Sequence, residues 1–173
     1  LSQSISEFGR MEAHTRLFDC ILDEQWQSFW EANRFMVKYN LALVKNQQKH
    51  WEFIRCLRND ERIKGGFIRQ EEVGIVQHIQ YMKKYSDKFY ICLANGEEAG
   101  YVGVINDDIR VATHPYFQGC GVGTFMINEV MKLHPTAFAK VKLENDASLR
   151  LFEKCGFKAK YFILEKEDET QSI

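Results

Sequence analysis

The chain has 173 residues, of which 45% are hydrophobic and 27% are charged, as expected of one globular domain of ordinary size. Its formal net charge is −1, which argues against the basic surface of a general nucleic-acid-binding protein. No apolar run approaches the ~20 residues of a membrane span, and the polar, mixed start lacks the pattern of a signal peptide. We therefore expect neither nucleic acid nor a membrane as a partner.

The cysteines are odd in number, irregular in spacing and free of any CxxC pair. This pattern favours reduced thiols in a cytoplasmic protein over a disulfide framework. It also offers no ligand set for a structural zinc ion, so we expect no metal. The cysteines are Cys20, Cys56, Cys92, Cys120 and Cys155.

Residues 1–38 are interpreted as a helical N-terminal extension, whose first ten residues are an expression remnant or the tail of a preceding domain. Apolar side chains recur at helical spacing within residues 14–37, which predicts a helix with one apolar face. That face consists of Phe18, Leu22, Trp26 and Phe29. A face this apolar is expected to be buried, either on the main domain or, alternatively, in a homodimer or against another domain.

The main domain is expected over residues 39–166, and its first half alternates strands with two helices. The sequence Asn95-Gly96 between two β-rich runs is a strong hairpin signal, and Gly65-Gly66 breaks the chain before the second helix. Strands are predicted at 39–45, 88–94, 99–105 and 109–113, and helices at 47–59 and 71–84.

The second half predicts a helix at 122–133, a strand at 137–143 after Pro135, a short helix at 147–154 and a last strand at 157–164. Gly156 suits the end of the short helix. Residues 167–173 are expected to be a polar tail. One α/β domain with a mixed sheet fits this order best.

Three glycines alternate between a strand and a helix, at Gly119, Gly121 and Gly123. Glycines let the backbone approach a ligand, and successive N–H groups at a helix N-terminus form a cradle for an anion such as a pyrophosphate. The loop has neither the lysine of a Walker loop nor the spacing of a dinucleotide-binding loop. A tight turn without a ligand is the alternative interpretation.

The loop sequence Gln118-Gly119-Cys120-Gly121-Val122-Gly123 matches the Q/R-x-x-G-x-G/A signature of the GNAT acetyltransferases. Residues 141–157 resemble the second signature of that family, with Asn145 at its start and Gly156-Phe157 at its end. The resemblance implies an acetyl-CoA-dependent N-acetyltransferase with the α/β GNAT fold. That fold is a mixed, largely antiparallel sheet with splayed fourth and fifth strands, flanked by helices.

The resemblance also implies which residues contact acetyl-CoA, the cosubstrate. The pantetheine amides would pair with the backbone of the fourth strand, the pyrophosphate would lie on the glycine loop, and Asn145 would contact the cosubstrate or simply cap its helix. These residues are Val111, Ala112, Thr113, Gln118, Gly119, Cys120, Gly121, Val122, Gly123, Thr124 and Asn145. Phe152 stands where many relatives have the tyrosine that protonates the leaving thiolate, which leaves that proton to water or makes it dispensable.

The acceptor is less well indicated. The order of Arg58, Asn59, Phe67, His78 and Tyr81 resembles that in GNAT enzymes of the pseudaminic-acid pathway, which acetylate nucleotide-linked amino sugars. An arginine suits a diphosphate and an aromatic ring can stack on a base. Alternatively, Arg58 is a surface charge at the end of its helix and His78 is a structural histidine. The rival functions are acetylation of a protein N-terminal amine and a non-catalytic acyl-CoA-binding module.

The general base that deprotonates the amine is expected among Asp107 and Asp108, because relatives carry an acidic residue near the start of the fourth strand. Asp108 is favoured because it directly precedes the strand. Both aspartates also suit a turn, which is the competing interpretation. His78 or an ordered water is the next candidate.

Overall fold

The structure is a computed structural model that describes residues 38–164. Its centre is a four-stranded antiparallel sheet in the order β1-β2-β3-β4, so that each strand pairs with its neighbour in sequence. The strands are β1 (Leu41–Lys45), β2 (Phe89–Ala94), β3 (Glu97–Ile105) and β4 (Asp108–Thr113). β1 and β4 are the edges of this sheet among the described residues.

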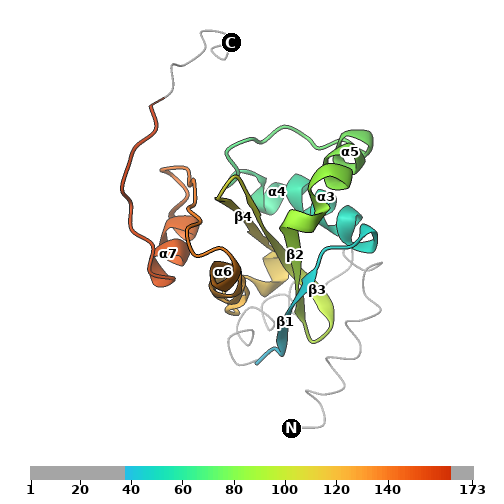
Figure 1. The fold of residues 1–173 in the computed structure, drawn as a ribbon, viewed down its shortest axis with the longest axis horizontal. Coiled ribbons are helices and arrows are strands. Elements are labelled where there is room, and N and C mark those ends of the chain that lie inside the picture. Colours follow the sequence, from blue (N-terminus) through green and yellow to red (C-terminus); the bar gives the residue numbers. More distant parts are fainter. Residues whose placement is uncertain (1–37, 165–173) are drawn as a thin grey trace, which may run out of the picture.

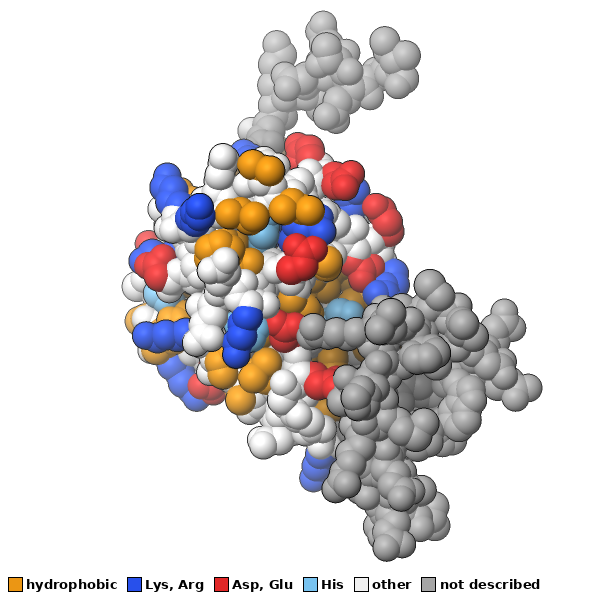
Figure 2. Space-filling model, turned by 90° about the vertical axis from the view of Figure 1, so that its right-hand side faces the viewer, with side chains coloured by type: hydrophobic (Ala, Val, Ile, Leu, Met, Phe, Trp, Pro, Cys, Tyr) orange, Lys and Arg blue, Asp and Glu red, His pale blue; other side chains and the backbone are white. Residues whose placement is uncertain are grey.

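Helices cover both faces of the sheet (Figure 1). On one side lie α3 (Trp51–Asn59), α4 (Glu61–Lys64) and α5 (Ile75–Tyr85), and on the other α6 (Val122–Leu133) with α7 (Asp146–Lys154) beside it. Short 3-10 turns are η3 (Gln48–His50), η4 (Ser86–Lys88) and η5 (Pro115–Phe117). On the side that carries α3 and α5, hydrophobic side chains are interspersed among charged ones (Figure 2).

Local sequence explains the centre of the sheet. Asn95 and Gly96 both have positive φ, 52° and 92°, as a two-residue turn between twisted strands requires. Opposite Phe89 on β2 stands Gly103 on β3, and a Cβ there would come within 2.5 Å of the phenyl ring. The missing side chain therefore lets Phe89 lie flat over β3.

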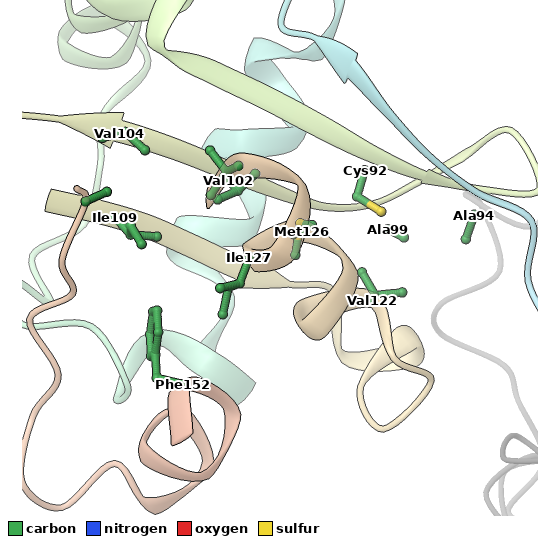
Figure 3. Close-up of a cluster of buried hydrophobic side chains, with 12 residues drawn as sticks. Cys92, Ala94, Ala99, Val102, Val104, Ile109, Val122, Met126, Ile127 and Phe152 are labelled. Atoms are coloured by element: carbon green, nitrogen blue, oxygen red, sulfur yellow. The ribbon is translucent and has the colours of Figure 1, made fainter. Parts of the chain in front are cut away.

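The larger hydrophobic cluster lies between the sheet and α6 (Figure 3). Met126 and Ile127 of α6 are fully buried there, and Phe152 brings α7 into the same cluster. The fully buried or nearly buried members are Cys92, Ala94, Ala99, Val102, Val104, Ile109, Val122, Met126, Ile127, Val130, Ala137 and Phe152. A second cluster, which includes Tyr101 and Ala112, packs the other face of the sheet against α3 and α5.

Most elements form where the sequence predicts them, but the strands expected at 137–143 and 157–164 do not. In the first segment only Phe138 reaches the sheet, through a parallel bridge to Asp108. The second segment has no strand, and Tyr161 to Leu164 are strongly exposed. Alternating apolar residues permit a strand, but a strand also needs a neighbouring edge to pair with. With the first segment outside the sheet, the second has no such edge among the described residues.

The expected N-terminal helix at 14–37 and the polar tail at 167–173 lie outside the described residues, so the proposed domain boundaries stay predictions. Within residues 38–164, no helix combines the length and apolar character needed to cross a membrane. The sequence also did not indicate α4, a single turn that begins at Glu61 and is capped by Asp60, whose carboxylate accepts a hydrogen bond from the N–H of Arg62.

Candidate functional site

One edge of β4 is paired and the other is open. The backbone of Arg110 and Ala112 lies in the ladder with β3, opposite Gly103 and Tyr101. On the outer side, the N–H of Ile109 donates to Phe138 O over 2.8 Å. Because the N–H and C=O of one residue point the same way and alternate along a strand, Val111 and Thr113 also point outward. No described residue pairs with their backbone groups.

These outward backbone groups are the ones that the resemblance assigns to the cosubstrate. Val111 and Thr113 fit that expectation because two N–H groups and two C=O groups remain available to the amides of a ligand. Ala112 does not fit it, because its backbone is committed to β3 and its side chain is buried in the cluster under α3 and α5.

The loop after β4 is built to turn its N–H groups outward. Gly119 and Gly121 have φ of 78° and 83°, a left-handed conformation that a side chain would strain. The first helical hydrogen bond of α6 runs from Phe125 N to Gly121 O. The preceding N–H groups, of Val122, Gly123 and Thr124, therefore have no helical acceptor.

Open space lies beside these donors at Gly121. A Cβ built there meets no atom within 4 Å, so the region beside the start of α6 is open. Donors at a helix N-terminus with open space beside them suit an anion. Gln118 and Cys120 instead donate their N–H groups within the turn, to Pro115 O and Phe117 O.

The missing side chain of Gly123 serves packing. A Cβ at this position would lie 2.9 Å from a methyl group of Leu151 on α7. The glycine thus lets α7 approach the start of α6. Phe152 also belongs to this contact, since it is 7% exposed and packs edge-on against Phe157. It has no group that could donate a proton.

Asn145 joins two parts of the chain that are distant in sequence. Its Oδ1 accepts from Ser148 N and caps α7, while its Nδ2 donates to Gly66 O over 2.9 Å. Nearby, Lys142 Nζ donates to Gly65 O over 3.3 Å. These two contacts hold the segment between α4 and α5 against the chain that leads into α7.

Two residues that were predicted to bind the acceptor substrate, Arg58 and Asn59, anchor the same segment, residues 65–74. Arg58 donates to Arg69 O over 3.0 Å, and its Cζ lies 4.1 Å from the centre of the Phe67 ring. Asn59 exchanges two hydrogen bonds with the backbone of Val73, of 2.8 and 3.0 Å. Arg58 and Asn59 therefore hold this segment in place through side-chain contacts.

A buried tyrosine that the sequence did not single out lies beside Arg58. Tyr101 on β3 is 3% exposed. Burial raises its pKa to about 12, and the hydrogen bond and positive charge of Arg58 offset part of that rise. Its position on the same face as Ala112 could have been found from the alternation along β3.

His78 lies between α3 and α5 and is 4% exposed. Its Nε2 is 2.7 Å from Trp51 O, so the ring N–H donates to that carbonyl. Desolvation lowers the pKa of His78, which keeps the ring neutral. A pocket of about 170 Å³ adjoins it, lined by residues of η3, α3 and α5 and by none of the glycine loop after β4. These contacts fit a structural histidine.

The two aspartates have different surroundings. Asp107 is in the turn, with φ of 60°, and its carbonyl accepts from Phe138 N. Asp108 is on β4 and 9% exposed, with Oδ2 at 3.2 Å from a guanidinium nitrogen of Arg110. Asp108, Arg110 and Ala112 alternate onto the face that looks toward α3 and α5. Asp108 is thus the carboxylate of β4 on the face toward α3 and α5.

Within residues 38–164, no cluster of three His, Cys, Asp or Glu side chains could hold a metal ion.

Comparisons with known proteins agree with this geometry. Residues 85–159 match the family model described as an acetyltransferase (GNAT) domain. A search of curated proteins found no match. Among solved structures, a domain from Methanocaldococcus jannaschii superposes with a TM-score of 0.64 at 20% identity, over 70% of this chain and 90% of the other.

Two enzymes have the same fold at lower identity. A spermidine N-acetyltransferase from Vibrio cholerae, in complex with CoA and spermine, has a TM-score of 0.64 at 19% identity, over 73% of this chain and 85% of the other. The aminoglycoside N-acetyltransferase AAC(6')-Iy has a TM-score of 0.57 at 16% identity, over 75% of this chain and 99% of the other. The predicted α/β GNAT fold is confirmed as a four-stranded antiparallel open sheet flanked by helices, while the expected fifth strand, beside the fourth, is reduced to the single bridge at Phe138 in the described residues.

Proposed function

We propose that this chain, whose residues 85–159 match the acetyltransferase (GNAT) domain model, binds acetyl-CoA along the outer edge of β4 and transfers the acetyl group to a primary amine. The observation that carries the proposal is that two sets of backbone N–H donors, one on β4 and one at the start of α6, lie near each other in the chain. Val111 and Thr113 point outward on β4, and the N–H groups of Val122, Gly123 and Thr124 at the start of α6 have no helical acceptor, with open space beside Gly121. An amide-containing arm that ends in a pyrophosphate matches this sequence of donors.

Acetyl-CoA supplies an activated thioester, and the residues of the chain supply position and proton transfer. The new C–N bond forms as the C–S bond breaks, and the amine must lose a proton. Asp108 is proposed to take up that proton, because it is the carboxylate of β4 on the face toward α3 and α5, the helices that carry most of the predicted acceptor-binding residues. Because Phe152 cannot donate a proton, the departing CoA thiolate takes its proton from water. The ordinary thiol pKa of ~8.5 permits this.

For the acceptor we propose an amine on a nucleotide-linked sugar. The half-exposed ring of Phe67 and the Tyr81 ring, 36% exposed, offer surfaces on which a base can stack. Arg58 contributes less than the sequence suggests, because its contacts with Arg69 and Phe67 already occupy much of the guanidinium. The second candidate is the N-terminal amine of a peptide.

A CoA-release assay tests the proposal. Purified protein, acetyl-CoA and a set of amines would be compared, with amino-sugar nucleotides beside peptides, and each product would be identified by mass spectrometry. Release of CoA with an N-acetylated amino-sugar nucleotide would support the full proposal. Turnover of peptides alone would reverse the ranking of acceptors. Acetyl-CoA binding without turnover of any amine would favour the non-catalytic acyl-CoA-binding module.

A further inference from the structure

Arg110 is a guanidinium on the acceptor side of β4 with most of its hydrogen-bonding capacity unused. Its side chain is 51% exposed, and the described contact is one pairing with Asp108, from a single nitrogen to a single oxygen over 3.2 Å. Arg58, by contrast, is held by a carbonyl and an aromatic ring. A guanidinium has five N–H donors in a planar fork, so Arg110 retains donors for a ligand.

Two tyrosine hydroxyls lie within electrostatic reach of Arg110. Burial raises the pKa of Tyr81, and the positive charge of Arg110 offsets part of that rise. The same guanidinium acts in the same direction on Tyr101. Phe89, which packs against both tyrosine rings, fills the space over Gly103, the residue that pairs with Arg110. The Arg110 guanidinium and the partly exposed Tyr81 therefore lie above an apolar base, whereas Tyr101 is buried and already bonded to Arg58.

The balance of charge in this cluster is positive. Arg58 and Arg110 carry two positive charges, and Asp108 carries one negative charge that pairs with Arg110. Arg110 also directly precedes Val111, whose outward N–H belongs to the proposed acetyl-CoA edge. Arg110 is thus on the proposed acetyl-CoA strand, and its guanidinium lies beside Asp108, the proposed proton acceptor.

We infer that Arg110 determines acceptor specificity by binding an anionic group, a carboxylate or a phosphate, that lies close to the amine to be acetylated. The inference rests on the proposed function. A guanidinium binds either anion through paired N–H donors. A polycationic amine would place positive charge against Arg110 and Arg58, and it is therefore disfavoured.

The test compares kcat/KM for acceptor pairs that differ in one anionic group. Phosphorylated glucosamine is paired with glucosamine, and an α-amino acid with its amide, so that the arms distinguish phosphate from carboxylate. Spermidine serves as the cationic acceptor. The variant is Arg110→Gln, and the control is Arg62→Gln. Arg62 has the same exposed fraction of 51% and also pairs with an aspartate, Asp60, but belongs to α4.

The wild-type protein should prefer the anionic member of at least one pair. Arg110→Gln should lower that preference by about 10- to 100-fold, the range expected for a charge-assisted hydrogen bond. Arg62→Gln should keep it. The preference is a ratio, so a general effect of Arg110 on Asp108 cancels. Arg110→Lys keeps the positive charge but loses the planar fork of donors, so its preference for the anionic acceptor should lie between those of wild type and Arg110→Gln. It replaces Arg110→Gln in the test if that variant folds poorly.

Three results would overturn the inference while leaving acetyl transfer in place: preferred turnover of spermidine, equal turnover within both pairs, or an unchanged preference in Arg110→Gln. The proposed function fails differently. If calorimetry detects acetyl-CoA binding but no amine releases CoA, both the acetyl transfer and the inference that rests on it are rejected.

Discussion

Replacing Gly121 by glutamate should abolish tight acetyl-CoA binding with only a modest loss of stability. The left-handed φ of 83° would cost a side chain roughly 1–2 kcal/mol of unfolding free energy. No atom lies within 4 Å of the new Cβ, so no steric clash adds to this cost. The larger effect is on the ligand, because the added carboxylate would stand beside the donors at the start of α6.

The expected loss of affinity follows from the charges. A carboxylate ~5 Å from a diphosphate of charge about −2 is destabilised by roughly 3 kcal/mol at an effective dielectric constant of ~40. That energy corresponds to a roughly 100-fold higher Kd for acetyl-CoA. Isothermal titration calorimetry measures this constant, and denaturant unfolding measures the stability of the same sample.

Gly96→Glu is the matched control. Gly96 also has a positive φ, 92°, and its added Cβ likewise meets no atom within 4 Å, but it lies in the turn between β2 and β3. Both variants should lose similar stability, while only Gly121→Glu should lose affinity. Equal affinity in both variants, whether retained or lost, would refute the assignment of the pyrophosphate to this loop.

Four further variants test other parts of the structure. Asp108→Asn should lower kcat by about 10²- to 10⁴-fold without changing the Kd for acetyl-CoA, whereas Asp107→Asn in the turn should keep a near-normal rate. Normal rates in both variants would exclude a carboxylate base. Asn145→Asp keeps the oxygen that caps α7 but loses the donor to Gly66, so amide exchange at residues 65–70 should accelerate while α7 stays protected; unchanged exchange would contradict the anchoring role. Burial lowers the pKa of His78 below its ordinary 6.5, so its contribution to stability is complete above that pH and is lost as the pH falls below it. Thermal melts between pH 5 and pH 8 should show a shallower pH dependence in His78→Gln than in wild type, and equal slopes would contradict the burial effect.

The sequence predicted the parts of the fold that local signals determine. Asn95-Gly96 located the β2–β3 hairpin, and the glycines before Val122 located the start of α6. Each signal lies within a few residues of the structure that it specifies. The strands expected at 137–143 and 157–164 depend on partners elsewhere in the chain, which alternation alone does not supply.

The same distinction holds at the site. The outward direction of Val111 and Thr113 follows from strand periodicity and the pairing with β3. The role of Arg58 could not be predicted in this way, because the carbonyl it binds belongs to Arg69 in an irregular segment. Arg110 could have been found, since alternation places it on the face of Asp108, but a charged residue on an edge strand is usually solvated and carries no functional signal by itself.

The central claim is that the outer edge of β4 and the glycine loop hold acetyl-CoA for transfer to an amine. The most direct measurement is a coupled one, in which CoA release and the mass of the acceptor are followed in the same reaction with wild type and Gly121→Glu. The proposal predicts one N-acetylated product for each CoA released by wild type, and loss of both signals in the variant at limiting acetyl-CoA. Release of CoA without an acetylated amine, or equal product formation by the variant, would contradict it.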